Sequence, residues 1–447
     1  MGRRPTRRAF LGAAGASVSL AGWTLADEPG RFPYAPGGPP AEPGPRPKLA
    51  AITTTYHYLS HAYHIVGRFL DGFQVHDGRG FHRPPFEVAS LFIEQTPTGD
   101  LGRAKAGRHG VRLAPSIQDA LTLGTGALAV DGVLLIAEHG DYPLNDKLQK
   151  LYPRSRFFLD VLDVFRTSGK SVPVFIDKHL SYDRAEARNM VEEAKALKVP
   201  LMAGSSLPVT WRLPSVELPL GGPINDAVVA SRGEIEIFGF HALESLQCMV
   251  ERRDLRGKPQ GVAAVTCLEG DAVWKAGDDG LWSRALLDRA LSRSHTLNPG
   301  DVRQNTRDFK PPPGRPTFLR TPLAFIVEYA DGLRATALIL NGHVDDTTFA
   351  GKLGGGETAS TLFYLPAPPG ANFFTPLVLR LEDFFRTGTP SYPVERTQLT
   401  GGILDAALES RHLGSKRIET PDLATIDYKA PADSGFIRSP VANPDAD

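Results

Sequence analysis

The chain has 447 residues, of which 41% are hydrophobic and 22% charged. This length exceeds a single hydrophobic core, so we expect two globular domains, and the composition excludes a largely disordered protein. Lysine plus arginine and aspartate plus glutamate each number 50, so the net charge is zero and no overall field attracts nucleic acid.

The first residues predict a targeting segment. Residues 6–11 read Thr-Arg-Arg-Ala-Phe-Leu, and an apolar run without acidic residues follows to about Ala26. Residues 1–26 thus resemble a twin-arginine export signal, which implies a periplasmic or other extracytoplasmic location. The alternative is a short membrane anchor, although the run is short and rich in small residues. Residues 27–47 predict a Pro- and Gly-rich linker, and no stable membrane span is expected after the signal is removed.

Residues 48–205 predict a Rossmann-like domain, because strand and helix patterns alternate along them. The expected strands are nearly continuous apolar runs, as in a parallel sheet that is covered on both faces. The strands cover residues 49–53, 88–93, 130–137, 172–176 and 200–203, and the helices cover 60–70, 116–123, 157–168 and 182–197.

Residues 206–430 predict a second α/β domain with a mixed or antiparallel sheet. We expect strands at 261–268, 323–329, 335–341 and 361–365, helices at 241–250, 374–385 and 399–413, a loop at 298–316 and a loose tail at 431–447. The two cysteines, Cys248 and Cys267, could pair in an oxidising compartment or remain separate buried thiols.

Residues 171–181 form the most informative segment. The apolar strand 172–176 leads directly into Asp177, Lys178 and His179. Open α/β sheets bind ligands at the carboxyl ends of their strands, and a lysine placed there is costly unless it is used. Lys178 is therefore a candidate site residue, although an ordinary ion pair with Asp177 is an alternative interpretation.

The segment around Asp177-Lys178-His179, in which a strand leads into this motif and a helix and a second strand follow, resembles the Gfo/Idh/MocA family of oxidoreductases. The usual motif of that family at this point is Glu-Lys-Pro. Gly239, His241 and Glu244 match a second family motif, Asp-x-Gly-x-His followed by an acid, with Ile237 where the first acid would stand. Weaker similarity covers residues 384–390 and 401–410.

The resemblance implies an N-terminal Rossmann domain, a C-terminal α/β domain with an open, mainly antiparallel sheet, and a homo-oligomer formed through that sheet. It also implies NAD or NADP as cofactor and a sugar, polyol or glycoside as substrate. Lys178 would bind the substrate hydroxyl, His241 would carry its proton, and Asp177 would belong to the same catalytic group.

The cofactor contacts must differ from the family pattern. The turn after the first strand lacks the family's Gly-x-Gly-x-x-Gly and reads Thr-Thr-Thr-Tyr-His from residue 53. Thr54, His61 and His139 are the candidate cofactor-binding residues near the strand ends. Glu94 ends the second strand, where the family's ribose-binding acid lies, and could instead cap that strand.

Substrate contacts are expected from His179 and Glu244 beside the catalytic pair. Trp211 and Arg212 lie near the predicted domain junction, and such junctions often hold small-molecule sites. An arginine beside a tryptophan suits a sugar or a carboxylate, and an ordinary packed pair is the alternative.

Two other functions remain open. His57, His61 and His64 are spaced by four and three residues, which puts imidazoles on one helix face. Imidazoles at such spacing can bind zinc, and His57, His61, His139 and His179 could serve a metal-dependent hydrolase or lyase. A carbohydrate-binding descendant that has lost catalysis is the third hypothesis, and no metal is expected under the favoured redox interpretation.

Overall fold

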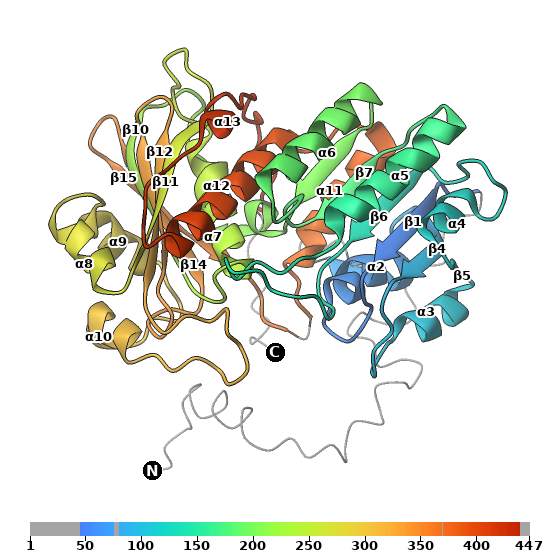
Figure 1. Ribbon diagram of the computed structural model, residues 1–447, viewed down its shortest axis with the longest axis horizontal. Coiled ribbons are helices and arrows are strands. Elements are labelled where there is room, and N and C mark those ends of the chain that lie inside the picture. The colour runs from blue at the N-terminus through green and yellow to red at the C-terminus, as the bar shows by residue number, and fades with distance from the viewer. Residues whose placement is uncertain (1–44, 76–79, 369, 439–447) are drawn as a thin grey trace, which may run out of the picture.

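The computed structural model describes residues 45–75, 80–368 and 370–438. The predicted export signal and most of the linker lie outside the described residues. The described chain forms two sheets with their helices (Figure 1). No helix within the described ranges combines the length and the apolar content needed to cross a bilayer.

The first sheet has six parallel strands in the order β5-β4-β1-β6-β7-β8. This is the strand order of a Rossmann fold. The strands are β1 (Lys48–Thr53), β4 (Glu87–Ile93), β5 (Arg112–Leu113), β6 (Gly132–Ile136), β7 (Val174–Asp177) and β8 (Leu201–Gly204).

Helices cover both faces of this sheet, as the continuous apolar strands predict. One face packs against α2 (His61–Asp71) and α3 (Gly102–His109), and the other against α4 (Ile117–Thr122), α5 (Arg154–Ser168) and α6 (Arg184–Ala196). Successive strand residues such as Ala51 and Ile52 therefore belong to opposite cores. A short hairpin, β2 (Phe73–Val75) with β3 (Gly80–His82), follows α2.

The second sheet has eight strands in the order β16-β11-β12-β13-β10-β14-β15-β9 and is mostly antiparallel, with β10 and β13 parallel. Its strands are β9 (Trp211–Leu213), β10 (Ile224–Ser231), β11 (Val262–Glu269), β12 (Leu323–Tyr329), β13 (Arg334–Ile339), β14 (Thr347–Leu353), β15 (Thr358–Tyr364) and β16 (Ile418–Glu419). The α/β fold class predicted from the sequence is confirmed.

The long helices α7 (Ile237–Val250) and α12 (Val394–His412) line the face of the second sheet that looks toward the first (Figure 1). Helix α12 also packs against α6 and β8. Helix α11 (Phe374–Thr387) packs against α2, so the hydrophobic core of the first sheet includes a helix from the C-terminal half of the chain. These contacts join the two halves closely.

The opposite face of the second sheet is covered by α8 (Asp271–Asp278) and α9 (Arg284–Leu291), which lie between β11 and β12 in the chain. Trp274 and Trp282 pack there against strand residues such as Val228 and Ala230. The short helices α10 (Val302–Arg307) and α13 (Pro421–Ala424) complete the structure, together with a 3-10 turn at Leu207–Val209.

Two expectations about local structure need correction. Residues 298–316 are not only loop, because Asp301 accepts a hydrogen bond from the Gln304 backbone N–H and caps α10. The helix expected from residue 241 begins four residues earlier, at Ile237. Cys248 and Cys267 are separate buried thiols and do not form the disulfide that was the other possibility from the sequence.

Candidate active site

The carboxyl ends of neighbouring strands bring the candidate residues together. Strand β1 lies between β4 and β6, so the order of strands reverses beside it, and ligands bind in such crevices in open α/β sheets. Thr54 follows β1, Glu138 and His139 follow β6 closely, and Lys178 follows β7. The second half of the chain adds α7, whose first turns face this edge.

Lys178 and His241 form the centre of this cluster. The Nζ of Lys178 lies 3.0 Å from the Nε2 of His241, although the two residues are 63 positions apart. Lys178 is 2% exposed and His241 is 8% exposed. Lys178 has a φ of 70°, a left-handed conformation that is costly for a lysine, and its N–H donates to the Gly204 carbonyl. Strain of this kind is concentrated at functional sites.

Glu244 takes the place of the acid that the sequence lacks at Ile237. The His241 Nδ1 lies 3.1 Å from the Ser205 hydroxyl and 3.4 Å from the Glu244 Oε2, and the same hydroxyl donates to Glu244. Burial, followed by the Lys178 ammonium, lowers the pKa of His241 well below its ordinary value. Burial raises the pKa of Glu244 to about 7, against the opposing hydrogen bonds from Ser205.

Gly204 is required beside this group. It has a φ of 134°, and a Cβ there would lie 2.4 Å from the Tyr392 hydroxyl and 3.0 Å from a Glu244 oxygen. Any side chain would therefore displace Glu244 or Tyr392. The backbone of β8 thus sets the position of the acid that faces His241.

Glu138 and Arg154 belong to the site and were not predicted. The Glu138 Oε1 lies 3.5 Å from the Lys178 Nζ, and the other Glu138 oxygen accepts a hydrogen bond from Arg154. Although burial opposes the effect, Lys178 and Arg154 hold the pKa of Glu138 well below its ordinary value. A sequence signal for Glu138 was available, because this acid comes directly after the apolar run 130–137. The same signal, a charged residue at the end of an apolar strand, pointed to Lys178.

His179 and Glu236 lie on the side of Lys178 that faces α7. The Arg154 Nη1 lies 3.3 Å from the His179 Nε2, and the Glu236 Oε1 lies 3.7 Å from the same nitrogen. The second Glu236 oxygen accepts a hydrogen bond from the Lys150 backbone N–H at 2.8 Å. Glu236 therefore faces His179, and it does not replace the missing acid of His241.

Asp177 faces the opposite direction, toward α2. Its Oδ2 lies 2.6 Å from the His61 Nδ1, whereas its Oδ1 has no hydrogen-bond partner among the described residues. The rings of His57 and His61 each lie 5.3 Å from that of His139. His139 also has a positive φ, 69°, and burial followed by His61 lowers its pKa to about 3.

These histidines do not form one ligand set with His179. His179 is on the Arg154 side, whereas His57, His61 and His139 group near Asp177. His64 is buried and stacks on Phe374 with ring centroids 4.9 Å apart. Within the residues that the structure describes, no three His, Cys, Asp or Glu side chains are arranged to hold a metal ion.

The turn after β1 offers side chains where a dinucleotide-binding turn usually offers glycines. Thr54, Thr55 and Tyr56 are buried, and the Thr54 hydroxyl donates to the Glu138 carbonyl at 2.9 Å. The Thr55 hydroxyl and the His139 Nδ1 are buried and lack a hydrogen-bond partner in the described chain. These atoms fit a dinucleotide held through hydroxyl and imidazole contacts, without the close backbone approach that glycines allow.

The remaining predicted residues lie differently. Both Glu94 oxygens are engaged, one by the Tyr142 hydroxyl and one by Arg156. Arg212 is fully buried, donates to the Val216 and Pro208 carbonyls and stacks over Phe436 with its guanidinium 4.3 Å from the ring centre. Arg212 is thus a packed structural residue, and the expectation that it contacts substrate is not supported by its position. Trp211, in β9, is buried as well.

Two surface hollows lie away from the Lys178 cluster. The larger, of about 580 Å³, is lined by α6, the start of β8 and residues 389–395. The smaller, of about 400 Å³, lies beside the end of α7 and residues 427–430. Neither is lined by Lys178 or His241, which are both buried, whereas His57, His61 and His139 are partly exposed.

Comparison with known proteins identifies the fold. No protein family and no curated protein matches the sequence. Among solved structures, GenD2 from gentamicin A biosynthesis, in complex with NAD, is similar over 86% of this chain and 99% of its own, with a TM-score of 0.51 and 14% identity. A probable dehydrogenase from Thermotoga maritima is similar over 84% and 99%, with a TM-score of 0.50 and 12% identity. The chain has the fold of the Gfo/Idh/MocA-type oxidoreductases.

Proposed function

We propose that this chain is an exported oxidoreductase that acts on a hydroxyl group of a sugar, polyol or glycoside, with NAD or NADP as cofactor. The observation that carries the proposal is the contact between the Lys178 Nζ and the His241 Nε2 at the carboxyl edge of a Rossmann-ordered sheet. A nicotinamide dinucleotide, when bound, supplies the hydride acceptor or donor. GenD2, which shares the fold, was crystallised with NAD.

The residues of this chain suit the proton part of such a reaction. A substrate hydroxyl placed between Lys178 and His241 would receive a hydrogen bond from the ammonium, which stabilises the developing alkoxide. The neutral imidazole of His241 can accept the hydroxyl proton at Nε2. Its Nδ1 faces Ser205 and Glu244, so the imidazolium that forms is stabilised by that pair.

The cofactor would lie along the β1 and β6 ends. Thr55 and His139 are the residues that would contact it, because the Thr55 hydroxyl and the His139 Nδ1 have no hydrogen-bond partner among the residues that the structure describes. Glu94 can offer a ribose hydroxyl only by sharing oxygens already bound to Tyr142 and Arg156. The twin-arginine-like segment, residues 1–26, supports the export part of the proposal.

The test begins with ligand release and titration. Protein purified from the exported fraction should release a nicotinamide dinucleotide on acid denaturation, or bind added NAD or NADP in calorimetric titration. Lys178→Ala should keep the fold and lower turnover of a polyol substrate by about 100-fold or more, because it removes a charge-stabilising donor. Lys170→Ala, at an exposed lysine shortly before β7, is the matched control and should keep full turnover.

Failure to bind either dinucleotide would reject the redox function. Unchanged turnover in Lys178→Ala would remove the lysine from the mechanism even if a dinucleotide binds. Location is tested separately, by replacing Arg7 and Arg8 with lysine and measuring whether the protein remains in the cytoplasmic fraction.

A further inference from the structure

Tyr392 brings a buried hydroxyl close to the acid that faces His241. The residue is 2% exposed, and its hydroxyl has no hydrogen-bond partner among the residues that the structure describes. Buried hydroxyls are paired in the great majority of native structures, and an unpaired one is costly. The hydroxyl of Tyr392 therefore requires a polar partner nearby.

The ring of Tyr392 is held in one position. It belongs to the hydrophobic core of the first sheet, and Pro390 and Pro393 restrict the backbone on both sides of it. The Arg396 guanidinium stacks over the ring, 4.0 Å from its centre, and is itself fixed by two hydrogen bonds to Glu251. Because the guanidinium lies over the ring face, the hydroxyl at the ring edge needs a different partner.

Gly204 is the point where Tyr392 meets Glu244. A Cβ on Gly204 would lie 2.4 Å from the Tyr392 hydroxyl oxygen and 3.0 Å from the Glu244 Oε1, so both oxygens lie around this one glycine. Only a residue without a side chain leaves room for both of them.

Glu244 can accept one more hydrogen bond at the oxygen beside Tyr392. Ser205 supplies two donors, its backbone N–H to Oε1 at 2.9 Å and its hydroxyl to Oε2. The His241 Nδ1 lies 3.4 Å from Oε2. A carboxylate offers about four acceptor positions, so Oε1 retains an open one.

The other ionisable groups around Glu244 have partners or are neutral. Arg396 directs two nitrogens to Glu251, Lys178 lies against Glu138, and burial raises the pKa of the Cys248 thiol to about 11. The ionisable groups that face Glu244 from the elements packed around it are His241 and Cys248 on α7, Lys178 after β7, Arg396 on α12 and Tyr392 just before α12.

We propose that Tyr392 is a positioning residue of this site, whose hydroxyl hydrogen-bonds the Glu244 Oε1, directly or through one water molecule, and holds that acid against His241. A hydroxyl that donates to a carboxylate favours the ionised form, which opposes the effect of burial on Glu244. The ionised acid in turn stabilises the imidazolium that forms when His241 takes the substrate proton. This inference rests on the proposed function, because it concerns the same histidine.

The test removes the hydroxyl and keeps the ring. Infrared spectra of the full mature chain, recorded without ligand across neutral pH, follow the carbonyl band of protonated Glu244, which is absent from Glu244→Gln. The midpoint of this titration should rise by about half a pH unit or more in Tyr392→Phe, because the ionised form loses a donor. Since no ligand is present, the result stands whether or not the chain binds a dinucleotide.

Two controls separate this hydroxyl from general effects of substitution. Tyr329→Phe removes another buried hydroxyl, which donates to Gln247 at 2.7 Å, and should leave the Glu244 midpoint unchanged. Ser245→Ala removes a buried hydroxyl next to Glu244 in the chain that also lacks a partner among the described residues, and it too should leave the midpoint unchanged.

A second measurement needs no variant of Glu244. The stability that a protonated Glu244 contributes is lost as the pH rises through its folded-state pKa, so this loss should extend to higher pH in Tyr392→Phe than in wild type. Denaturant unfolding at several pH values measures it.

Turnover gives a third readout, with the polyol identified for the wild type. Tyr392→Phe should lower kcat by about threefold or more, move the acid limb of the pH profile to higher pH and leave KM unchanged, because the residue acts through Glu244 and does not touch substrate.

An unchanged or lowered Glu244 midpoint in Tyr392→Phe would overturn the inference, and so would an equal rise in either control. A raised KM with an unchanged kcat would overturn it as well, because Tyr392 would then contact substrate. If the wild type neither binds a dinucleotide nor turns over a polyol, the proposed function fails by itself, and the infrared midpoint still decides whether Tyr392 serves Glu244.

Discussion

Glu138 bridges Lys178 and Arg154, so that one buried carboxylate serves two cations, one directly after β7 and one at the start of α5. All three side chains are at most 3% exposed. Removing one partner of a buried ionic group leaves charge without compensation, whereas an exposed pair contributes little. The arrangement makes Glu138 a centre of stability as well as a residue that positions Lys178.

We expect Glu138→Gln to lower the free energy of unfolding by about 3 to 5 kcal/mol, because Lys178 and Arg154 lose their shared counter-charge. Urea denaturation at neutral pH measures this change. Glu357→Gln, at an exposed acid, should change the same quantity by less than about 0.5 kcal/mol. Equal effects of the two substitutions would mean that the buried bridge does not stabilise the fold.

Glu244 should make the protein less stable as pH rises from about 5 to 7.5. Its folded-state pKa is raised to about 7 by burial, so the unfolded chain loses the proton first and is favoured as pH increases. The raised pKa corresponds to a contribution of about 3 kcal/mol to the free energy of unfolding. This contribution is fully present below the pKa of the unfolded chain and is lost as the pH rises through 7.

Glu244→Gln removes this titration. The difference in unfolding free energy between wild type and variant should therefore favour wild type more at pH 5 than at pH 7.5. Denaturant unfolding at several pH values checks this difference, and parallel curves for the two proteins would contradict the raised pKa.

His64 should make the protein sensitive to acid. Burial, followed by Arg68, lowers its folded-state pKa to about 2, so below the unfolded value of about 6.5 only the unfolded chain takes up the proton. The contribution of His64 to the free energy of unfolding is fully present above pH 6.5. It decreases as the pH falls, by about 2 kcal/mol between pH 7 and 5.

We expect His64→Gln to be less stable at pH 7, because the stacking on Phe374 is lost, but to lose less stability on acidification. The slope of unfolding free energy against pH is the measurement. His412→Gln, at an exposed histidine at the end of α12, should keep the wild-type slope, and an unchanged slope in His64→Gln would refute the assignment.

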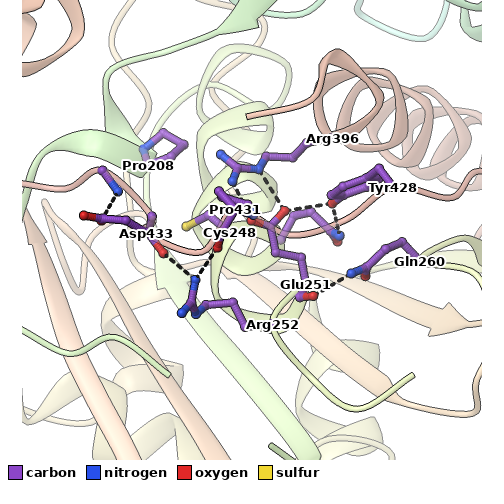
Figure 2. Close-up of polar contacts among 12 residues, drawn as sticks. Pro208, Cys248, Glu251, Arg252, Gln260, Arg396, Tyr428, Pro431 and Asp433 are labelled. Carbon is purple, nitrogen blue, oxygen red and sulfur yellow. Dashed lines mark hydrogen bonds and ion pairs between the residues drawn. The ribbon is translucent and has the colours of Figure 1, made fainter. Parts of the chain in front are cut away.

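A second buried ion pair holds the C-terminal segment. Arg396 donates to both oxygens of Glu251, at 2.8 and 2.5 Å, and the Tyr428 hydroxyl donates to the same carboxylate at 2.9 Å (Figure 2). Arg252, the next residue in the chain, donates to the Pro431 carbonyl at 2.7 Å. The end of α7, α12 and residues 428–438 are thereby joined.

Glu251→Gln should cost about 3 to 5 kcal/mol of unfolding free energy and speed amide hydrogen exchange in residues 428–438. Urea denaturation and exchange measured by mass spectrometry test the two effects. Glu328→Gln breaks the exposed pair with Arg417 and should cost less than about 1 kcal/mol without changing exchange in that segment. Unchanged exchange in Glu251→Gln would mean that other contacts hold the segment.

The helices α8 and α9 cover the sheet face through which self-association was expected. The resemblance implied an oligomer formed through an open sheet face, whereas α8 and α9 cover that face here with Trp274, Trp282 and Leu287. Self-association through the bare sheet would require these helices to move. Oligomeric state stays a prediction to be measured by sedimentation.

Sequence periodicity was sufficient to predict strands and site residues where the local pattern agrees with the tertiary environment. The strands of the first sheet are buried on both faces, so each is a continuous apolar run, and an acid, lysine or histidine directly after such a run marks the ligand edge. That reasoning located Asp177, Lys178 and His179. Strands β10 and β14 were not predicted, because their pairing with β13 and with each other joins segments far apart in the chain.

Only the tertiary structure decided which side chains meet. His61 reaches Asp177 across 116 positions and His241 reaches Lys178 across 63, and Glu244 rather than Glu236 accompanies His241. Residue type and spacing determine which groups are available at a strand end or helix start. The direction of each side chain, and therefore its partner, charge and pKa, depends on packing between the two sheets, which no local pattern encodes.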